Sequence, residues 1–140
     1  YEQIKDFIEK WIFLVNETER KVTLLRCHAS NCLYHEMYDQ LPLYILGKEF
    51  KKTDDKITVT ILLLIALYMS AEKEAAEMRL KNFNYFLKRN IKDLGHNKFK
   101  RYINFVKFYS FMLKNDNINA EHCLQDEIAY RMWCSKVIKK

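Results

Sequence analysis

The chain holds only two glycines and one proline in 140 residues. Sheets that are joined by tight hairpins need residues that tolerate positive φ at their turns, and glycine does so most readily. At the same time, 49% of the residues are apolar and 14% are aromatic, which is ample material for a core. The composition therefore predicts an all-α fold and argues against a disordered chain.

The length and the cysteine content predict how the chain is organised. A chain of 140 residues is expected to form one α-helical domain, residues 1–140. Because the sequence begins with Tyr1 and not with Met, we expect a fragment of a longer protein or a processed secreted one. Four cysteines are few for a disulfide-built secreted domain, which favours an intracellular protein, nuclear or cytoplasmic. The glycosylation triplet that starts at Asn16 keeps a secreted protein as the alternative.

Apolar periodicity predicts a compact bundle of about six helices around a central hydrophobic helix at roughly 57–71. The expected helices cover residues 4–15, 30–46, 57–71, 72–94, 98–114 and 120–138. The first helix either continues toward Leu25 or breaks near Asn16, and Pro42 kinks or ends the second. Residues 49–56 read as a charged connector. The uninterrupted apolar run from Ile61 to Met69 is shorter than the ~20 residues of a membrane span, so we place it in a core.

Positive charge is concentrated in one segment, which gives the domain a basic surface. Residues 79–114 hold ten of the 24 Lys and Arg residues and one of the 18 Asp and Glu residues, a local charge of +9. The 78 residues before this segment carry a net charge of −3. Such a field implies an acidic partner, which is nucleic acid, anionic lipid or an acidic protein surface.

The basic segment is expected to form two antiparallel helices, because only residues 95–97 separate the predicted helices 72–94 and 98–114. A buried row on the first helix is predicted to contain Ala76, Leu80, Phe83, Leu87, Ile91 and Leu94. The second helix has two apolar rows. One contains Phe99, Tyr102 or Ile103, Val106, Tyr109 and Leu113, and the other contains Phe105, Phe108 and Met112. A helix with two apolar rows is either buried on two sides or offers one side to a partner.

The second apolar row leads to our predicted partner-binding site. We expect Phe105, Phe108 and Met112 to anchor a partner segment, as apolar residues do when a helix binds in a groove. The full set of predicted apolar anchors is Tyr85, Phe86, Phe105, Phe108 and Met112, and the predicted basic residues around them are Lys81, Lys88, Lys92, Lys100 and Lys107. The structural alternative is that the aromatic side chains form the core and the lysines are a solvated helix face.

A cluster of Cys and His residues is the remaining chemical signal. His28, Cys32 and His35 are spaced i, i+4 and i+7, on one helix face. With Cys27 and Cys123 they are a weak alternative for a zinc site, but the paired C-x₂-C spacing that makes such a prediction specific is missing. Disulfides Cys27–Cys32 or Cys32–Cys123 are a further alternative, and packing is the simplest one. We therefore predict no metal.

The expected function is non-catalytic, without a cofactor, because a nucleophilic site needs an oxyanion hole that two glycines hardly supply. We expect an interaction domain, a scaffold or adaptor, that binds an acidic or amphipathic protein segment. Two alternatives stay open. One is a nucleic-acid-binding helical module that uses residues 79–114, and the other is a secreted four-helix cytokine-like protein. The identity of the partner and the oligomeric state stay open as well.

Overall fold

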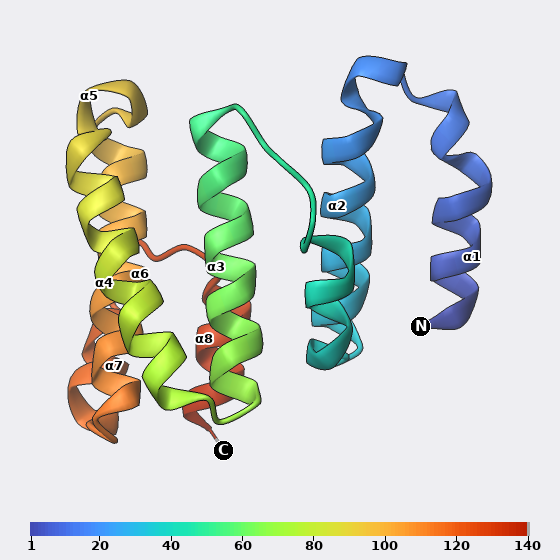
Figure 1. Cartoon of the computed structure of the whole chain (residues 1–140). Coiled ribbons are helices and arrows are strands. Elements are labelled where there is room, and N and C mark those ends of the chain that lie inside the picture. Colours follow the sequence, from blue (N-terminus) through green and yellow to red (C-terminus); the bar gives the residue numbers. More distant parts are fainter. Residues whose placement is uncertain (140) are drawn as a thin grey trace. The chain divides into compact units, whose positions relative to one another are not determined.

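The computed structural model describes residues 1–139, and over these residues all regular structure is helical. The elements are α1 (Glu2–Trp11), η1 (Ile12–Leu14), α2 (Glu17–Tyr34), η2 (Tyr38–Tyr44), α3 (Thr53–Met69), α4 (Lys73–Arg89), α5 (Ile91–Leu94), α6 (His96–Leu113), α7 (Asn117–Cys123) and α8 (Arg131–Ile138), where η marks a 3₁₀ helix (Figure 1). The all-α prediction is confirmed.

The backbone forms two compact units, an N-terminal unit (Tyr1–Ala71) and a C-terminal unit (Glu72–Lys140). The prediction of one domain over residues 1–140 stays a prediction.

In the N-terminal unit, α1 packs beside α2, and η2 packs against both α2 and α3 (Figure 1). Of the two paths that the sequence left open for the first helix, the structure has the break near Asn16, because Val15 and Asn16 are extended with ψ of 143° and 134°. The helix predicted at 30–46 is wrong. The structure has α2 at Glu17–Tyr34 and then the 3₁₀ helix η2, which contains Pro42. Glu36 takes a left-handed conformation with φ of 57°, which ends the helical path between them.

The apolar segment of the sequence forms α3, which begins at Thr53, inside the connector expected at 49–56. It holds more buried side chains than any other described helix, as expected for a hydrophobic core helix. These are Asp55, Ile57, Ile61, Leu62, Leu64, Ile65 and Ala66. Within residues 1–139, no helix combines the length and the apolar character needed to cross a membrane.

In the C-terminal unit, α4 and α6 lie side by side (Figure 1). The helix predicted at 72–94 is interrupted at Asn90, whose Nδ2 donates a hydrogen bond to the Phe86 carbonyl at 2.8 Å. Gly95 then connects α5 to α6 with φ of +80°, a conformation that glycine adopts without strain. The predicted buried row is confirmed except at Ile91, which is 40% exposed because it follows the interruption.

The single helix predicted at 120–138 is wrong, because the structure has α7 and α8 with a connector between them. Asp116 caps α7 by accepting a hydrogen bond from the Asn119 backbone N–H at 3.2 Å, so the helix begins early. The connector is attached to α6, where Asn104 Nδ2 donates to the Glu127 carbonyl at 2.9 Å. Tyr130 is left-handed with φ of 55° and redirects the chain into α8.

The core of the C-terminal unit forms around Trp133 of α8. Its ring centroid lies 6.1 Å from that of Phe105, 6.3 Å from that of Phe108 and 6.2 Å from that of Tyr109. These separations are typical of packed aromatic pairs. Phe105, Phe108 and Met112 are all buried. Their prediction as exposed partner anchors is therefore wrong, since α8 covers this face of α6.

We expect Phe108→Ala to lower the free energy of unfolding by about 3–5 kcal/mol, because it removes a fully buried ring from a packed aromatic cluster. Chemical denaturation followed by circular dichroism measures this loss. Met78→Ala, on an exposed side chain of α4, is the control and should change stability by less than about 0.5 kcal/mol. Equal stability of Phe108→Ala and the control would contradict the core assignment.

Candidate functional site

A groove runs along the surface between α4 and α6 and has a volume of about 280 Å³. Its lining consists of Glu77, Leu80, Lys81, Asn84, Val106, Ser110, Leu113 and Lys114. Leu80 forms an apolar floor together with the half-buried side chains of Val106 and Leu113. Val106 and Leu113 belong to the first of the two apolar rows of the helix predicted at 98–114. The groove exists because α8 takes the other row into the core.

Lysines stand along both edges of this groove. Lys81 and Lys114 line it directly, one from each helix. Helical spacing of seven residues places Lys88 on the same side of α4 as Lys81, and it places Lys107 and Lys100 on the same side of α6 as Lys114. The five predicted lysines, Lys81, Lys88, Lys92, Lys100 and Lys107, are all exposed.

The predicted lysines are available for an external partner. In the described part of the chain, none of the five forms an ion pair with a carboxylate. The C-terminal unit has 15 Lys and Arg residues against eight Asp and Glu residues, so its surface field is positive. Glu77 at one end of the groove is the acidic exception.

The predicted anchors Tyr85 and Phe86 lie on α4 outside the groove lining. Tyr85 is exposed and Phe86 is half-buried. Sequence reasoning missed Leu80, Val106 and Leu113 as groove residues, because it assigned them to closed helix contacts. The signal that pointed toward the groove was the seven-residue repeat of lysines, which also includes Lys114.

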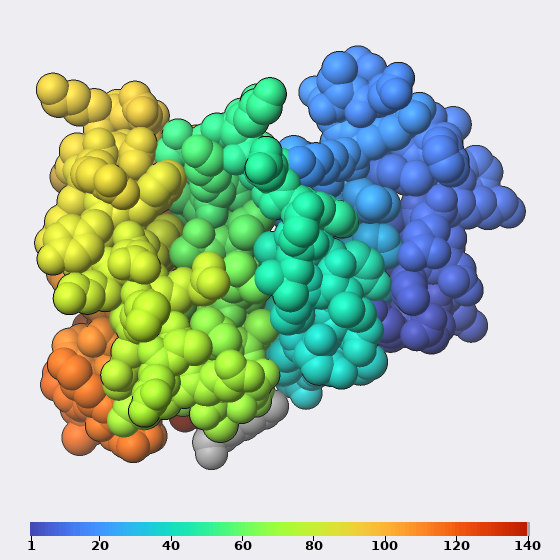
Figure 2. Space-filling model, in the orientation of Figure 1, coloured from blue at the N-terminus to red at the C-terminus, as the bar shows by residue number. Residues whose placement is uncertain are grey.

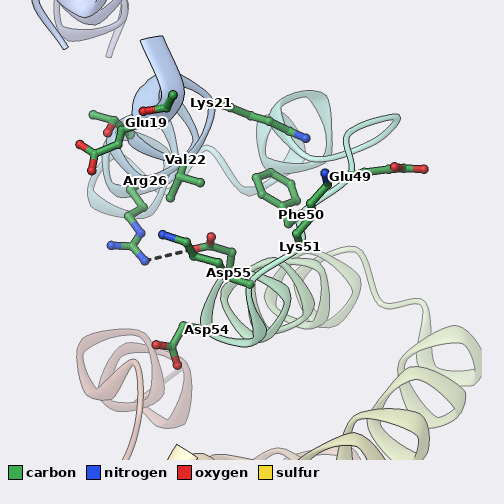
Figure 3. A pocket seen from close by; sticks show the side chains of 12 residues that line it. Glu19, Lys21, Val22, Arg26, Glu49, Phe50, Lys51, Asp54 and Asp55 are labelled. Carbon is green, nitrogen blue, oxygen red and sulfur yellow. Dashed lines mark hydrogen bonds and ion pairs between the residues drawn. The ribbon is translucent and has the colours of Figure 1, made fainter. Parts of the chain in front are cut away.

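A second pocket, of about 550 Å³, lies in the N-terminal unit between α2, the connector and the start of α3 (Figure 3). Its lining consists of Thr18, Glu19, Lys21, Val22, Thr23, Arg26, Glu49, Phe50, Lys51, Lys52, Asp54 and Asp55. Four of these residues are basic and four are acidic, so the pocket selects no ligand by net charge. The Phe50 ring forms a cation–π contact with Lys21, whose Nζ lies 4.7 Å from the ring centroid.

An ion pair crosses this pocket and joins α2 to α3. Arg26 Nη2 donates a hydrogen bond to Asp55 Oδ1 at 3.2 Å (Figure 3). The Asp55 carboxylate is buried and the Arg26 side chain is largely exposed. A buried carboxylate is costly without a cation, so Arg26 offsets the burial of Asp55. We therefore assign this pocket a structural role, the connection of α2 to α3.

We expect Arg26→Ala to destabilise the chain by about 1–3 kcal/mol, because it leaves the buried Asp55 carboxylate without its partner. Lys51→Ala removes an exposed cation of the same pocket and serves as the control. Denaturant unfolding of both variants makes the comparison. If the double variant Arg26→Ala/Asp55→Ala is no more stable than Arg26→Ala, the ion pair does not offset this burial.

The Cys and His residues that formed the metal alternative lie in different surroundings. The His28 ring stacks on Tyr44 with 4.2 Å between centroids, and the His35 Nδ1 lies 3.0 Å from the Asn31 carbonyl oxygen. Cys32 is buried, with Sγ 3.8 Å from the Tyr1 hydroxyl. Cys27 is exposed on α2 and Cys123 is buried in α7. Across residues 1–139, no three His, Cys, Asp or Glu side chains gather as a metal site requires.

All four cysteines are free thiols, and three of them are buried. Burial raises the pKa of the Cys32 and Cys123 thiols and raises that of Cys134 to about 12. These three groups are therefore protonated at neutral pH, and a thiol is a poor nucleophile and a poor metal ligand in that form.

His28 makes the stability of the chain depend on pH. Burial lowers its pKa below the ordinary value of 6.5, and Lys48 and Lys5 lower it further, while Glu9 raises it. The unfolded chain takes up a proton on His28 near pH 6.5, before the folded chain does. The contribution of His28 to stability is thus fully present above pH 6.5 and is lost as the pH falls below it.

We expect His28→Phe, which keeps a ring against Tyr44, to reduce the loss of stability between about pH 7.5 and 5.5. Thermal unfolding at each pH measures it. His122→Phe removes an exposed histidine and should keep the slope of the parent chain. Equal slopes for His28→Phe and the parent would rule out this histidine as the cause.

Comparison with protein-family models, with curated proteins and with solved structures finds no match to this chain.

Proposed function

We propose that the chain is a non-catalytic interaction domain that binds an acidic, amphipathic helical segment of a partner protein in the groove between α4 and α6. The observation that carries this proposal is the apolar floor of Leu80, Val106 and Leu113 between lysine edges. Helix-in-groove recognition uses this combination, in which apolar side chains enter the groove and charged ones meet its edges.

The dimensions and charges of the groove support a peptide over a small molecule. A volume of about 280 Å³ lies just below the ~300–1,000 Å³ of ligand pockets, and it accommodates one or two apolar side chains. Lys81 and Lys114 both line it, and neither forms an ion pair with a carboxylate among the described residues. Acidic side chains on either side of an apolar row would pair with them.

Two observations support a non-catalytic role. The buried thiols have raised pKa values, which disfavours a thiolate nucleophile. In the N-terminal unit, the His28 ring stacks on Tyr44, and the His35 Nδ1 lies 3.0 Å from the Asn31 carbonyl oxygen. Neither arrangement leaves a base poised beside a nucleophile.

The test starts from random peptides of about 16 residues displayed on phage, which is long enough for four helical turns. We expect the peptides that are selected for binding to the chain to carry apolar residues at i, i+4 and i+7, with Asp or Glu beside them. Fluorescence anisotropy of an enriched peptide should show that Lys81→Glu/Lys114→Glu weakens binding on the order of 100-fold. Val106→Ala should weaken it on the order of 10-fold, through the floor.

The control Arg79→Glu/Lys139→Glu also reverses two exposed charges of the C-terminal unit, but both lie outside the groove. Its peptide affinity should stay within about threefold of the parent value. Labelled random DNA and RNA form the second arm. Nucleic acid that binds more tightly than every enriched peptide at about 150 mM salt would overturn the proposal. Peptide affinity that survives Lys81→Glu/Lys114→Glu would overturn it as well.

A further inference from the structure

Helix α1 exposes a row of large apolar side chains. Ile4, Phe7 and Trp11 follow one another at helical spacing, and Leu14 in η1 extends the row by three residues. The exposed fractions are 44% for Ile4, 62% for Phe7, 46% for Trp11, 70% for Phe13 and 77% for Leu14. Figure 2 shows α1 (dark blue) at the surface of the N-terminal unit. Ile4, Phe7, Trp11 and Leu14 are called the α1 row below.

The α1 row is not the face that α1 uses to pack on α2. Helical spacing puts Ile8 and Ile12 on a neighbouring face, and both are half-buried in the N-terminal unit. α1 therefore has two apolar faces, and its own unit covers only one of them. An exposed apolar surface of this kind marks an interaction site.

The order of side chains along the α1 row fits an antiparallel copy of itself. The row reads aliphatic, aromatic, aromatic, aliphatic from Ile4 to Leu14. In a two-fold antiparallel pair, Ile4 of one copy would meet Leu14 of the other, and Phe7 would meet Trp11. Each layer then joins side chains of similar kind, and the two aromatic layers lie in the middle. The spacing of three, four and three residues is that of helix pairs with interlocking side chains.

Charge also favours the antiparallel pair. Gln3, Asp6 and Lys10 form the polar row beside the α1 row, at helical spacing. An antiparallel partner brings Asp6 of one copy close to Lys10 of the other, whereas a parallel partner sets like charges opposite each other. The acidic residues Glu2, Asp6 and Glu9 outnumber Lys5 and Lys10 on α1. A helix that binds anionic membranes carries a basic polar face instead, so the charges disfavour a lipid surface.

The exposed area fits a weak dimer. At about 200 Å² for each large side chain, the exposed fractions of the four residues in the α1 row amount to roughly 450 Å² per copy. A pair would bury about 900 Å², which lies in the range of weak, reversible interfaces below about 1,200 Å².

We propose that the α1 row is a homodimer interface, in which α1 packs antiparallel against α1 of a second copy of this chain. The interface consists of an aromatic centre, Phe7 and Trp11, with aliphatic ends, and it is bordered by Asp6–Lys10 pairs between the copies. This surface is independent of the groove between α4 and α6, so each proposal stands or falls alone.

Sedimentation equilibrium of the 140-residue chain tests the dimer. At about 100 µM we expect twice the monomer mass of 17.0 kDa. Phe7→Glu places a charge at the centre of the interface and should weaken association on the order of 100-fold. Ile118→Glu, an equally exposed apolar residue on α7, is the matched control and should leave the dimer unchanged. Circular dichroism checks that both variants keep their helix content.

A charge exchange identifies the antiparallel arrangement. Asp6→Lys alone should weaken the dimer, and Asp6→Lys/Lys10→Asp should restore it. A parent chain that stays monomeric at about 100 µM overturns the proposal, as does a dimer that survives Phe7→Glu. Binding of the monomer to anionic phospholipid vesicles, lost in Phe7→Glu, would overturn it in favour of a membrane surface.

Discussion

Packing of Trp133 against α6 is the contact on which the C-terminal unit depends. Three rings of α6 lie within 6.1–6.3 Å of the indole, measured between centroids. Because α6 is apolar around much of its circumference, its rotation is not fixed by hydrophobicity alone. The packing of Trp133 fixes the rotation of α6, because Phe105 and Phe108 contact the indole in the core. Val106 and Leu113 then remain half-buried beside α4, and the groove follows from this choice.

The same rotation determines where the positive charge acts. With α6 fixed, Lys114 stands on one edge of the groove and Lys81 on the other. The lysines that recur every seven residues continue these edges along both helices. The positive charge of residues 79–114 is thereby placed, in part, along the edges of a groove. The proposal of an acidic, amphipathic partner depends on this coincidence of apolar floor and basic edges.

Helices α1 and α6 both have two apolar faces, but the structure leaves a whole apolar face exposed only on α1. A helix with two apolar faces is either buried on both or offers one to a partner, and the sequence predicted the second outcome for α6 through Phe108. In the structure, Trp133 of α8 packs on Phe105 and Phe108 of α6, while α1 packs on α2 with one face and leaves the other exposed. Periodicity gives the number of apolar faces on a helix. It does not give the number of neighbours that the tertiary structure provides.

The sequence by itself determined the helical class, the apolar helix α3 and most of the buried row of α4 and α5. These depend on local properties, namely glycine scarcity and apolar spacing within one helix. The tertiary structure alone decided that 120–138 divides into α7 and α8, that Phe105, Phe108 and Met112 are core, and that the α1 row is exposed. These outcomes depend on contacts between distant segments, such as Asn104 with Glu127 and Trp133 with α6, which no local pattern encodes.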